Sequence, residues 1–229
     1  MNRVRLVGHL VAVVCVAAGL SMIYCAVVPA AEPPPQETKD GLHLRKSTKS
    51  TLVYVKPGAT FGQYAKFAIL DCPVAFDKDW QRDYNSSAST RVTDSDMERI
   101  KTGLSEEFKK VFTKELTKGG YEVVDHGGPD VLILRPAILN LRVTAPDLMT
   151  PGINTTVVRS AGSMTLYLEL WDSVSNTILA RAMDAQGDPG MYGQVSSRVT
   201  NVAAADDILR KWADILRDRL DAARAAPPG

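Results

Sequence analysis

The sequence has few of the residues that usually bind metals or form covalent cross-links. It contains three cysteines and three histidines among 229 residues. Cys15 and Cys25 lie in an apolar N-terminal segment, so Cys72 has no second cysteine in the rest of the chain to pair with. The spacing of His43, His126 and Cys72 matches no zinc-binding pattern. The sequence therefore predicts a fold that depends on its hydrophobic core, with no metal and no cofactor.

The chain also lacks a strong excess of charge of either sign, because its formal net charge is +1. A nucleic-acid partner is not expected, since such proteins carry a clear basic excess on one face. One local group is basic and comprises His43, Arg45, Lys46, Lys49 and Lys56. A solvated, flexible arm is the simpler interpretation. Contact with an anionic surface is the alternative, and it requires more charge density than these five residues supply.

Recognisable catalytic motifs are absent from the sequence as well. It contains no G-x-S-x-G nucleophile elbow, no P-loop and no dinucleotide fingerprint. The carboxylates are numerous but scattered, so an envelope hydrolase with an unrecognised carboxylate or serine site stays open as the alternative to a non-catalytic role. The polar stretch from Asp172 to Asn176 resembles a reactive cluster. It is better explained as a hairpin turn, because Asp and Ser bond to their own backbone and Asn tolerates positive φ.

Residues 1–30 have the pattern of a bacterial export signal. Arg3 and Arg5 precede the apolar stretch 6–28, and small residues follow, so cleavage is predicted after Ala30. The stretch is long for a signal, and an uncleaved membrane anchor over residues 6–28 is the alternative. Lipidation at Cys25 is a third option, although the bulky Tyr24 before it departs from the usual lipoprotein pattern. Each option places the protein in the periplasm or cell envelope, with membrane contact only through this segment if it is retained.

The rest of the chain divides into a linker, one domain and a short tail. Residues 31–50 are rich in proline, charge and hydroxyl groups, which predicts a flexible linker. A single domain is expected over residues 51–224, and residues 225–229 form a disordered tail. Five strands are expected within the domain, at 64–70, 121–124, 131–143, 164–171 and 177–185. Pro136 interrupts the third of them, which favours a sheet edge or a bulge there.

Two helices complete the domain. Ser95 and Glu98 form a capping-box pattern before apolar residues at helical spacing, and Gly119 with Gly120 provides a stop. A second amphipathic pattern, from Val202 to Leu220, predicts a closing helix. The order β-α-β-β-β-β-α predicts an α+β fold, a two-layer sandwich with a sheet of about five mostly antiparallel strands and both helices on one face. Strands two to five would form a meander, and strand one would lie parallel to a neighbour.

Several short motifs resemble the bacterial domain-of-unknown-function family 3313. They lie between about residues 40 and 223 and include Val53–Ala59, Val74–Asp77, Gly120–Asp125, Gly128–Leu132, Glu169–Ser173 and Trp212–Ala213. The resemblance implies an exported envelope protein with a single domain, of a kind often described as a lipoprotein, and it implies no catalytic residues. This chain departs from the family in lacking a lipid-attachment pattern. It also has Asn176 where the family tends to have glycine, a mild change because asparagine also adopts positive φ.

Two surfaces are candidates for binding a partner such as an envelope protein or a cell-wall component. The loops 144–163 and 186–199 should meet at one end of the meander, where long loops commonly bind partners. The outward face of the fourth strand carries Tyr167, Glu169 and Trp171, which would lie exposed beside Arg181 or packed under residues 51–63. The residues proposed for partner binding are Arg159, Tyr167, Trp171, Tyr192 and Arg198. The sequence leaves the oligomeric state open.

Overall fold

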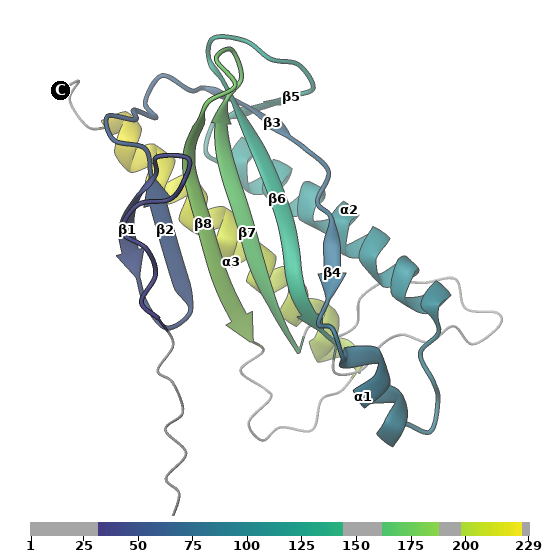
Figure 1. Cartoon of the computed structure of the whole chain (residues 1–229). Coiled ribbons are helices and arrows are strands. Elements are labelled where there is room, and N and C mark those ends of the chain that lie inside the picture. Colours follow the sequence, from purple (N-terminus) through teal and green to yellow (C-terminus); the bar gives the residue numbers. More distant parts are fainter. Residues whose placement is uncertain (1–31, 144–161, 188–197, 226–229) are drawn as a thin grey trace, which may run out of the picture. The chain divides into compact units, whose positions relative to one another are not determined.

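The computed structural model describes residues 32–143, 162–187 and 198–225. Within these ranges, eight strands form one mixed sheet, and three helices accompany it (Figure 1). The strands are β1 (His43–Ser47), β2 (Thr51–Val55), β3 (Lys66–Ile69), β4 (Val74–Phe76), β5 (Glu122–Val124), β6 (Val131–Arg142), β7 (Ser163–Asp172) and β8 (Ile178–Gly187). The helices are α1 (Trp80–Ser87), α2 (Asp94–Lys118) and α3 (Arg198–Ala225). The α+β class is confirmed, while the expected number of about five strands is too small.

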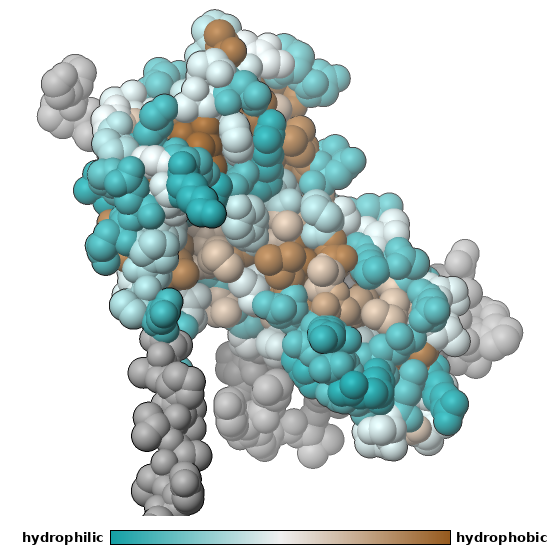
Figure 2. Space-filling model, viewed as in Figure 1, coloured by the Kyte–Doolittle hydropathy of each residue, from teal (hydrophilic) through white to brown (hydrophobic). Residues whose placement is uncertain are grey.

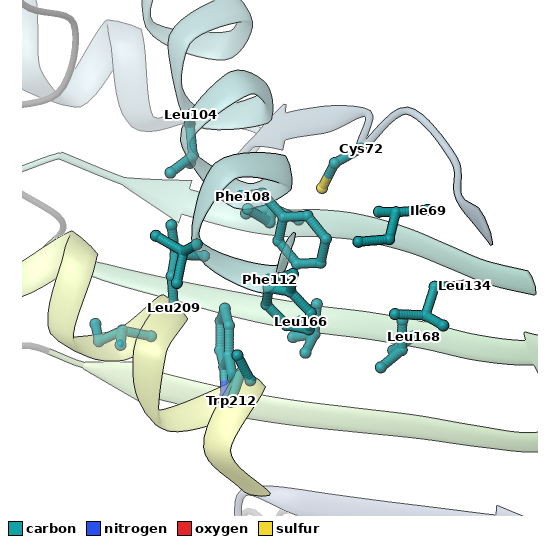
Figure 3. Close-up of a cluster of buried hydrophobic side chains, with 14 of the residues drawn as sticks. Ile69, Cys72, Leu104, Phe108, Phe112, Leu134, Leu166, Leu168, Leu209 and Trp212 are labelled. Carbon is teal, nitrogen blue, oxygen red and sulfur yellow. The ribbon is translucent and has the colours of Figure 1, made fainter. Parts of the chain in front are cut away.

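The order of strands across the sheet is β1-β2-β8-β7-β6-β3-β5, and β4 also pairs with β6. Helices α2 and α3 lie together on one face of the sheet (Figure 1). The largest cluster of buried side chains fills the space between them and the sheet. Figure 3 shows part of this core, where Phe108, Phe112, Leu209 and Trp212 from the helices meet Leu134, Leu166 and Leu168 from the sheet. The prediction of helices covering one face of the sheet is confirmed for these two.

The central hairpins follow the alternation of apolar and polar residues. In β7, Met164, Leu166, Leu168 and Leu170 are buried while the residues between them are half-buried. β7 pairs antiparallel with both β6 and β8, so these three strands form the meander that the sequence predicted. The turn from β7 to β8 has Asn176 at φ 49°, as expected for a tight hairpin turn.

The position of β5 differs from the prediction. β5 pairs with β3 in parallel, and β3 pairs in parallel with β6, so β3 lies between β5 and β6. β3 is more deeply buried than β5, since Phe67, Ala68 and Ile69 are all buried. A strand with this composition is stable with a neighbour on both sides, and the shorter β5 takes the edge. The predicted meander of four strands is therefore wrong in its first member.

Pro136 lies inside the sheet and pairs in regular register with Leu168, so the prediction of an edge position or a bulge at this residue is wrong. The neighbouring strand is interrupted beside it. β3 pairs with β6 up to Leu134, and β4 pairs with β6 from Ile138 onward. Ile138 donates its N–H to Pro73 O at 2.9 Å. The nitrogen of Pro136 faces the gap between β3 and β4, because alternate residues of a strand point their backbone groups to the same side. A residue without an N–H therefore leaves no hydrogen bond unformed at that position.

Helix α2 begins slightly earlier than the sequence suggested. Its N-cap is Thr93, whose hydroxyl accepts from Asp96 N at 3.2 Å, while the Asp96 carboxylate accepts from Thr93 N at 3.0 Å. This capping box replaces the one predicted from Ser95 and Glu98, because aspartate can also reach back to the N-cap N–H. The stop is as predicted, with Gly120 at φ 78°.

The region 75–91, where the sequence predicted neither a strand nor a helix, contains helix α1. Trp80 is buried at the start of α1, stacks on Phe76 with ring centroids 4.6 Å apart, and donates its Nε1–H to Val143 O at 3.1 Å. This helix is hard to predict from the sequence, because its eight residues are mostly polar. One buried aromatic side chain holds it against the domain.

The stretch 31–50, predicted to be a flexible linker, contains part of the sheet. β1 pairs antiparallel with β2, and β2 pairs antiparallel with β8. Leu42, just before β1, is fully buried. The described part of the predicted linker thus packs on the domain. A polar edge strand resembles a linker in composition, since only one of its faces contacts other residues.

Candidate functional site

The face of the sheet opposite α2 and α3, called here the outer sheet face, brings together charged and aromatic side chains. Glu169 on β7 lies directly opposite Arg135 on β6 and Arg181 on β8. Tyr167 and Trp171 flank Glu169 on the same face of β7, because alternate residues of a strand share a face. The two aromatic residues that the sequence proposed for partner binding therefore lie on either side of a carboxylate.

Four hydrogen-bond donors surround the Glu169 carboxylate. Tyr167 Oη and Arg181 Nε donate to Oε1, and Trp171 Nε1 donates to Oε2 at 2.9 Å. Arg181 Nη2 also lies 2.8 Å from Oε1. A carboxylate offers about four acceptor positions, and these contacts crowd Oε1 and occupy one position of Oε2. Glu169 is better suited to holding the strands and their side chains in place than to accepting a proton from a substrate.

Glu169 and Tyr167 keep their ordinary charge states at neutral pH, since Glu169 is ionised and Tyr167 is neutral. Burial alone would raise the pKa of Glu169, but hydrogen bonds from Tyr167, Arg181 and Trp171 outweigh burial and lower it. Burial, assisted by the bond to Glu169, raises the pKa of Tyr167 to about 12. A general acid or base works best with a pKa near the operating pH. The shifts of Glu169 and Tyr167 move both groups away from that range.

Arg181 connects this cluster to the N-terminal segment of the domain. Its Nη1 donates to Asp40 Oδ1 at 3.2 Å, and its Nη2 donates to Asp40 Oδ2. The hydrogen bond to Arg181 is the main cause that lowers the pKa of Asp40. Asp40 belongs to the stretch 34–42, so a bidentate ion pair attaches that stretch to the sheet.

A small hydrophobic cluster supports the same attachment. Leu42, Tyr54 and Ile178 are buried together, and Trp171 packs against them. Tyr54 Oη also donates to Pro35 O at 3.2 Å. The N-terminal stretch therefore covers the outer sheet face over β2 and β8. Trp171 is consequently packed within the molecule, partly against Tyr54, so for this residue the alternative of packing under residues 51–63 is confirmed.

Arg135 stacks on the other side of Trp171. Its guanidinium carbon lies 4.2 Å from the ring centroid, and its Nη2 donates to Asn176 Oδ1 at 3.4 Å. Its Nε is buried and has no hydrogen-bond partner in the described structure. Cation–π contact with tryptophan stabilises such an arginine in part.

The remainder of the outer sheet face is less polar. It includes Leu52, Ala137, Leu139, Thr165 and Met183, which are half-buried, and Ala185, which is exposed. Figure 2 views this side of the molecule and shows hydrophobic surface crossing its middle, between hydrophilic areas above and below. The helices lie behind the sheet in this view (Figure 1). This part of the face is a flat apolar surface bordered by polar groups.

A serine, a histidine and an aspartate, the groups of a serine hydrolase, occur in the turns at one end of the sheet, but their hydrogen bonds are not those of a catalytic triad. Ser173 Oγ donates to Gly128 O at 2.6 Å and accepts from Gly128 N at 2.9 Å. Its proton is therefore committed to a backbone carbonyl, whereas a nucleophilic serine donates to a base. His126 pairs with its exposed neighbour Asp125 at 3.1 Å. Ser173 acts as a clamp between the turn 125–130 and the hairpin turn 172–177.

The hairpin turn itself is held by Asp172. Its Oδ1 accepts from both the N–H and the hydroxyl of Ser175, at 2.6 Å each, and its Oδ2 accepts from Tyr64 Oη at 2.9 Å. The polar stretch Asp172–Asn176 thus bonds to its own backbone, as the turn interpretation predicted, and it also bonds to Tyr64.

Cys72 is a buried side chain of the core. Burial raises the pKa of its thiol to about 12, so it remains a protonated thiol at neutral pH. Within the described ranges, no group of three or more histidine, cysteine or acidic side chains is arranged to hold a metal ion.

The structure locates some, but not all, of the residues proposed for partner binding. Tyr167 and Trp171 lie together on the outer sheet face. Arg159 and Tyr192 fall outside the described residues, and Arg198 begins α3 with a side chain that is not described. Sequence reasoning did not identify Asp40 and Arg135 as members of the cluster. The alternation of β6 would have placed Arg135 on the same face as Ala137, but no sequence signal connected Asp40 to Arg181.

The described part of the chain contains no helix that is long and apolar enough to cross a membrane. The segment 6–28, expected to be an export signal or an anchor, lies outside it.

Several solved structures are similar to this chain at low sequence identity. The PelC dodecamer from Paraburkholderia phytofirmans is 13% identical with a TM-score of 0.40, over 73% of this chain and 97% of PelC. A minor lipoprotein from Acinetobacter baumannii is 14% identical with a TM-score of 0.36, over 70% and 95% of the two chains. A DUF4136 family protein from Bacteroides thetaiotaomicron is 12% identical with a TM-score of 0.31, over 76% and 98%. A comparison with curated proteins found no match.

The sequence itself gives a more direct assignment. The model of a family described as "Protein of unknown function (DUF3313)" matches residues 39–216. This range includes all eight strands and most of α3. It confirms the resemblance that the motifs between residues 40 and 223 suggested. The chain therefore belongs to the DUF3313 family of proteins of unknown function.

Proposed function

We propose that this protein is exported to the bacterial cell envelope and acts there as a non-catalytic binding or structural module. The partner is an envelope protein or a cell-wall component, and it contacts the apolar part of the outer sheet face around Tyr167. The observation that carries this proposal is the contrast within that face. Its charged groups are neutralised by one another, while apolar side chains beside them remain accessible to a partner.

The internal neutralisation supports binding over catalysis. A carboxylate that acts as a general acid or base needs a pKa near the working pH. Glu169 is held by Tyr167, Trp171 and Arg181, and its pKa is lowered. A flat apolar surface with a polar border suits contact with another macromolecule.

The location is tested by the mass of the purified protein from its native cells. A chain that begins at Ala31 supports export with cleavage. A lipidated N-terminus at Cys25, or an intact apolar segment in the membrane fraction, supports export with an anchor. Recovery of the chain with its intact N-terminus in the cytosol contradicts the envelope location.

The binding surface is tested by cross-linking and co-purification from envelope fractions. Ala137→Glu and Ala185→Glu each add a charge to the outer sheet face, and we expect both to abolish capture of a specific partner. Thr117→Glu adds the same charge at an exposed position on α2 and serves as the matched control. Circular dichroism confirms that each variant is folded. Equal capture by the three variants would contradict the proposed surface.

A further inference from the structure

The hairpin formed by β1 and β2 carries cations that have no acidic partner in the described structure. Arg45 and Lys46 lie on β1, Lys49 lies in the turn, and all three are exposed. The sequence from His43 to Val55 contains these three basic residues and no aspartate or glutamate. The nearest acids upstream are already engaged, because Glu37 pairs with His43 at 3.8 Å and Asp40 binds Arg181. The hairpin therefore presents a net positive surface.

Backbone hydrogen bonds hold these cations in a fixed arrangement. The pairing of β1 with β2 shifts between Leu44 and Lys46, which leaves Arg45 as an extra residue in the strand. In the turn, Thr48 N donates to Thr51 O at 2.8 Å, and Thr51 N donates to Thr48 Oγ1 at 2.9 Å. A flexible arm would spread its charges over many conformations. The hairpin keeps these charges together, so the local charge density is higher than that of the flexible arm that the sequence suggested.

The first residues of the domain lie beside this hairpin. Glu37 forms an antiparallel bridge with His43, and Leu44 N donates to Gln36 O at 2.9 Å. Pro35 also contacts the hairpin, because its carbonyl accepts from Tyr54 Oη at 3.2 Å. Any membrane attachment upstream would therefore be joined to the domain next to this hairpin.

We infer that the β1–β2 hairpin rests on the headgroups of an anionic phospholipid bilayer and orients the domain on it. The inference rests on the proposed envelope location in its membrane-attached form. Six residues, 29–34, lie between the apolar segment and Pro35, which accepts a hydrogen bond from Tyr54, and six extended residues span at most about 20 Å. Each basic side chain near an anionic bilayer strengthens binding roughly fivefold. This attraction extends over a Debye length of about 10 Å at moderate salt.

The test attaches the domain to vesicles at the position where the upstream segment would hold it. All described strands, helices and core residues lie beyond residue 41, so a chain beginning at residue 31 contains the whole described core. In that chain, Ala31→Cys provides an accessible thiol, while Cys72 is buried with its pKa raised to about 12. The protein is coupled to a maleimide lipid in vesicles of phosphatidylcholine alone or of phosphatidylcholine with phosphatidylglycerol.

The readout is the rate at which an amine-reactive reagent acylates each lysine, followed by mass spectrometry. We expect Lys46 and Lys49 to react at least about fivefold more slowly on the anionic vesicles, and high salt to remove the difference. Lys109 and Lys114, exposed on α2, are internal controls and should react equally on both vesicles. Arg45→Gln with Lys46→Gln should remove the protection of Lys49, whereas Lys109→Gln with Lys114→Gln should retain it.

Two results would overturn the inference. One is an equal rate for Lys46 and Lys49 on the two kinds of vesicle. The other is protection by soluble polyphosphate without protection by the anionic vesicles, which would assign the hairpin to a free polyanion. Neither result affects the envelope location, which the mass of the native protein tests separately. A cytosolic location would instead remove the basis of both proposals, whatever the vesicles show.

Discussion

The two faces of the sheet are built from the same strands and differ in what holds them. On the inner face, Leu134, Leu166 and Leu168 pack into one large core against α2 and α3. On the outer face, Arg135, Tyr167 and Glu169 alternate with those leucines, and bonds between charged and aromatic groups replace most of the packing. Because it buries more apolar side chains, we expect the inner face to contribute more to stability than the outer face. The proposed partner surface lies on the outer face.

The difference also shows in how the N-terminal stretch is attached. The helices cover the inner face with many fully buried side chains, including Phe108, Phe112 and Leu209. The stretch 34–42 covers part of the outer face through one ion pair and a cluster of three buried residues. Attachment by few contacts is weaker, so local opening is expected there first.

The largest effect is expected from a cavity in the inner face. Phe108 is fully buried and stacks on Phe112 with ring centroids 3.9 Å apart. Phe108→Ala should lower the free energy of unfolding by about 3–5 kcal/mol, measured by urea titration. Val174→Ala, at a position that is 68% exposed, should change it by less than about 0.5 kcal/mol. Similar losses for the two variants would contradict the described core.

A smaller effect is expected from the centre of the outer face. Glu169→Gln removes the charge and places an amide where donors converge, so we expect a loss of about 2 kcal/mol. Glu98→Gln breaks an exposed pair with Lys101 and should cost less than about 0.5 kcal/mol. If the two variants were equally stable, the bonds around Glu169 would contribute nothing beyond those of a surface pair.

The same comparison should depend on pH. The folded protein lowers the pKa of Glu169 from the value of 4.5 that applies to the unfolded chain. A carboxylate of this kind adds stability that is complete above its unfolded pKa and is lost as pH falls through its folded pKa. The gap in unfolding free energy between the parent protein and Glu169→Gln should therefore be constant at neutral pH and narrow below pH 4.5. A gap that widened in acid would reverse the sign of the predicted shift.

The smallest of these effects concerns the N-terminal stretch. Asp40→Asn weakens the ion pair with Arg181, and because Asp40 is partly exposed we expect a loss of about 1 kcal/mol. Limited proteolysis between residues 34 and 42 should become faster, while cleavage elsewhere should not. Glu37→Gln is the matched control, since Glu37 pairs only loosely with His43 at 3.8 Å. Equal proteolysis of the two variants would show that Asp40 does not hold the segment.

The parts of the fold that the sequence predicted are those with a regular hydrophobic period. The strands β6 and β7 and the helices α2 and α3 each bury alternating or helically spaced residues, so their existence follows from local pattern. β8 buries Ile178, Leu179 and Ala180 in succession, and its prediction depended on the hairpin turn before it. β1 could not be found in this way, because four of its five residues are exposed. The placement of β5 beyond β3 depends on which parallel neighbour is available, and local sequence does not contain that information.

A regular hydrophobic period also made part of the candidate site predictable. Alternation along β7 placed Tyr167, Glu169 and Trp171 on one outward face and brought Arg181 near them. It could not show that Arg181 also binds Asp40, since that contact joins segments far apart in the sequence. The alternation therefore identified the surface, while the tertiary fold decides which of its groups are free to bind a partner.

The central claim, that the outer sheet face is where this protein meets its partner, can be tested directly by photo-crosslinking in living cells. One variant carries a photoreactive amino acid in place of Met183 on the outer face, and another carries it in place of Thr117 on α2. We predict a discrete cross-linked product from position 183 and none from position 117. A product from position 117 alone would place the partner on the helices and contradict the claim.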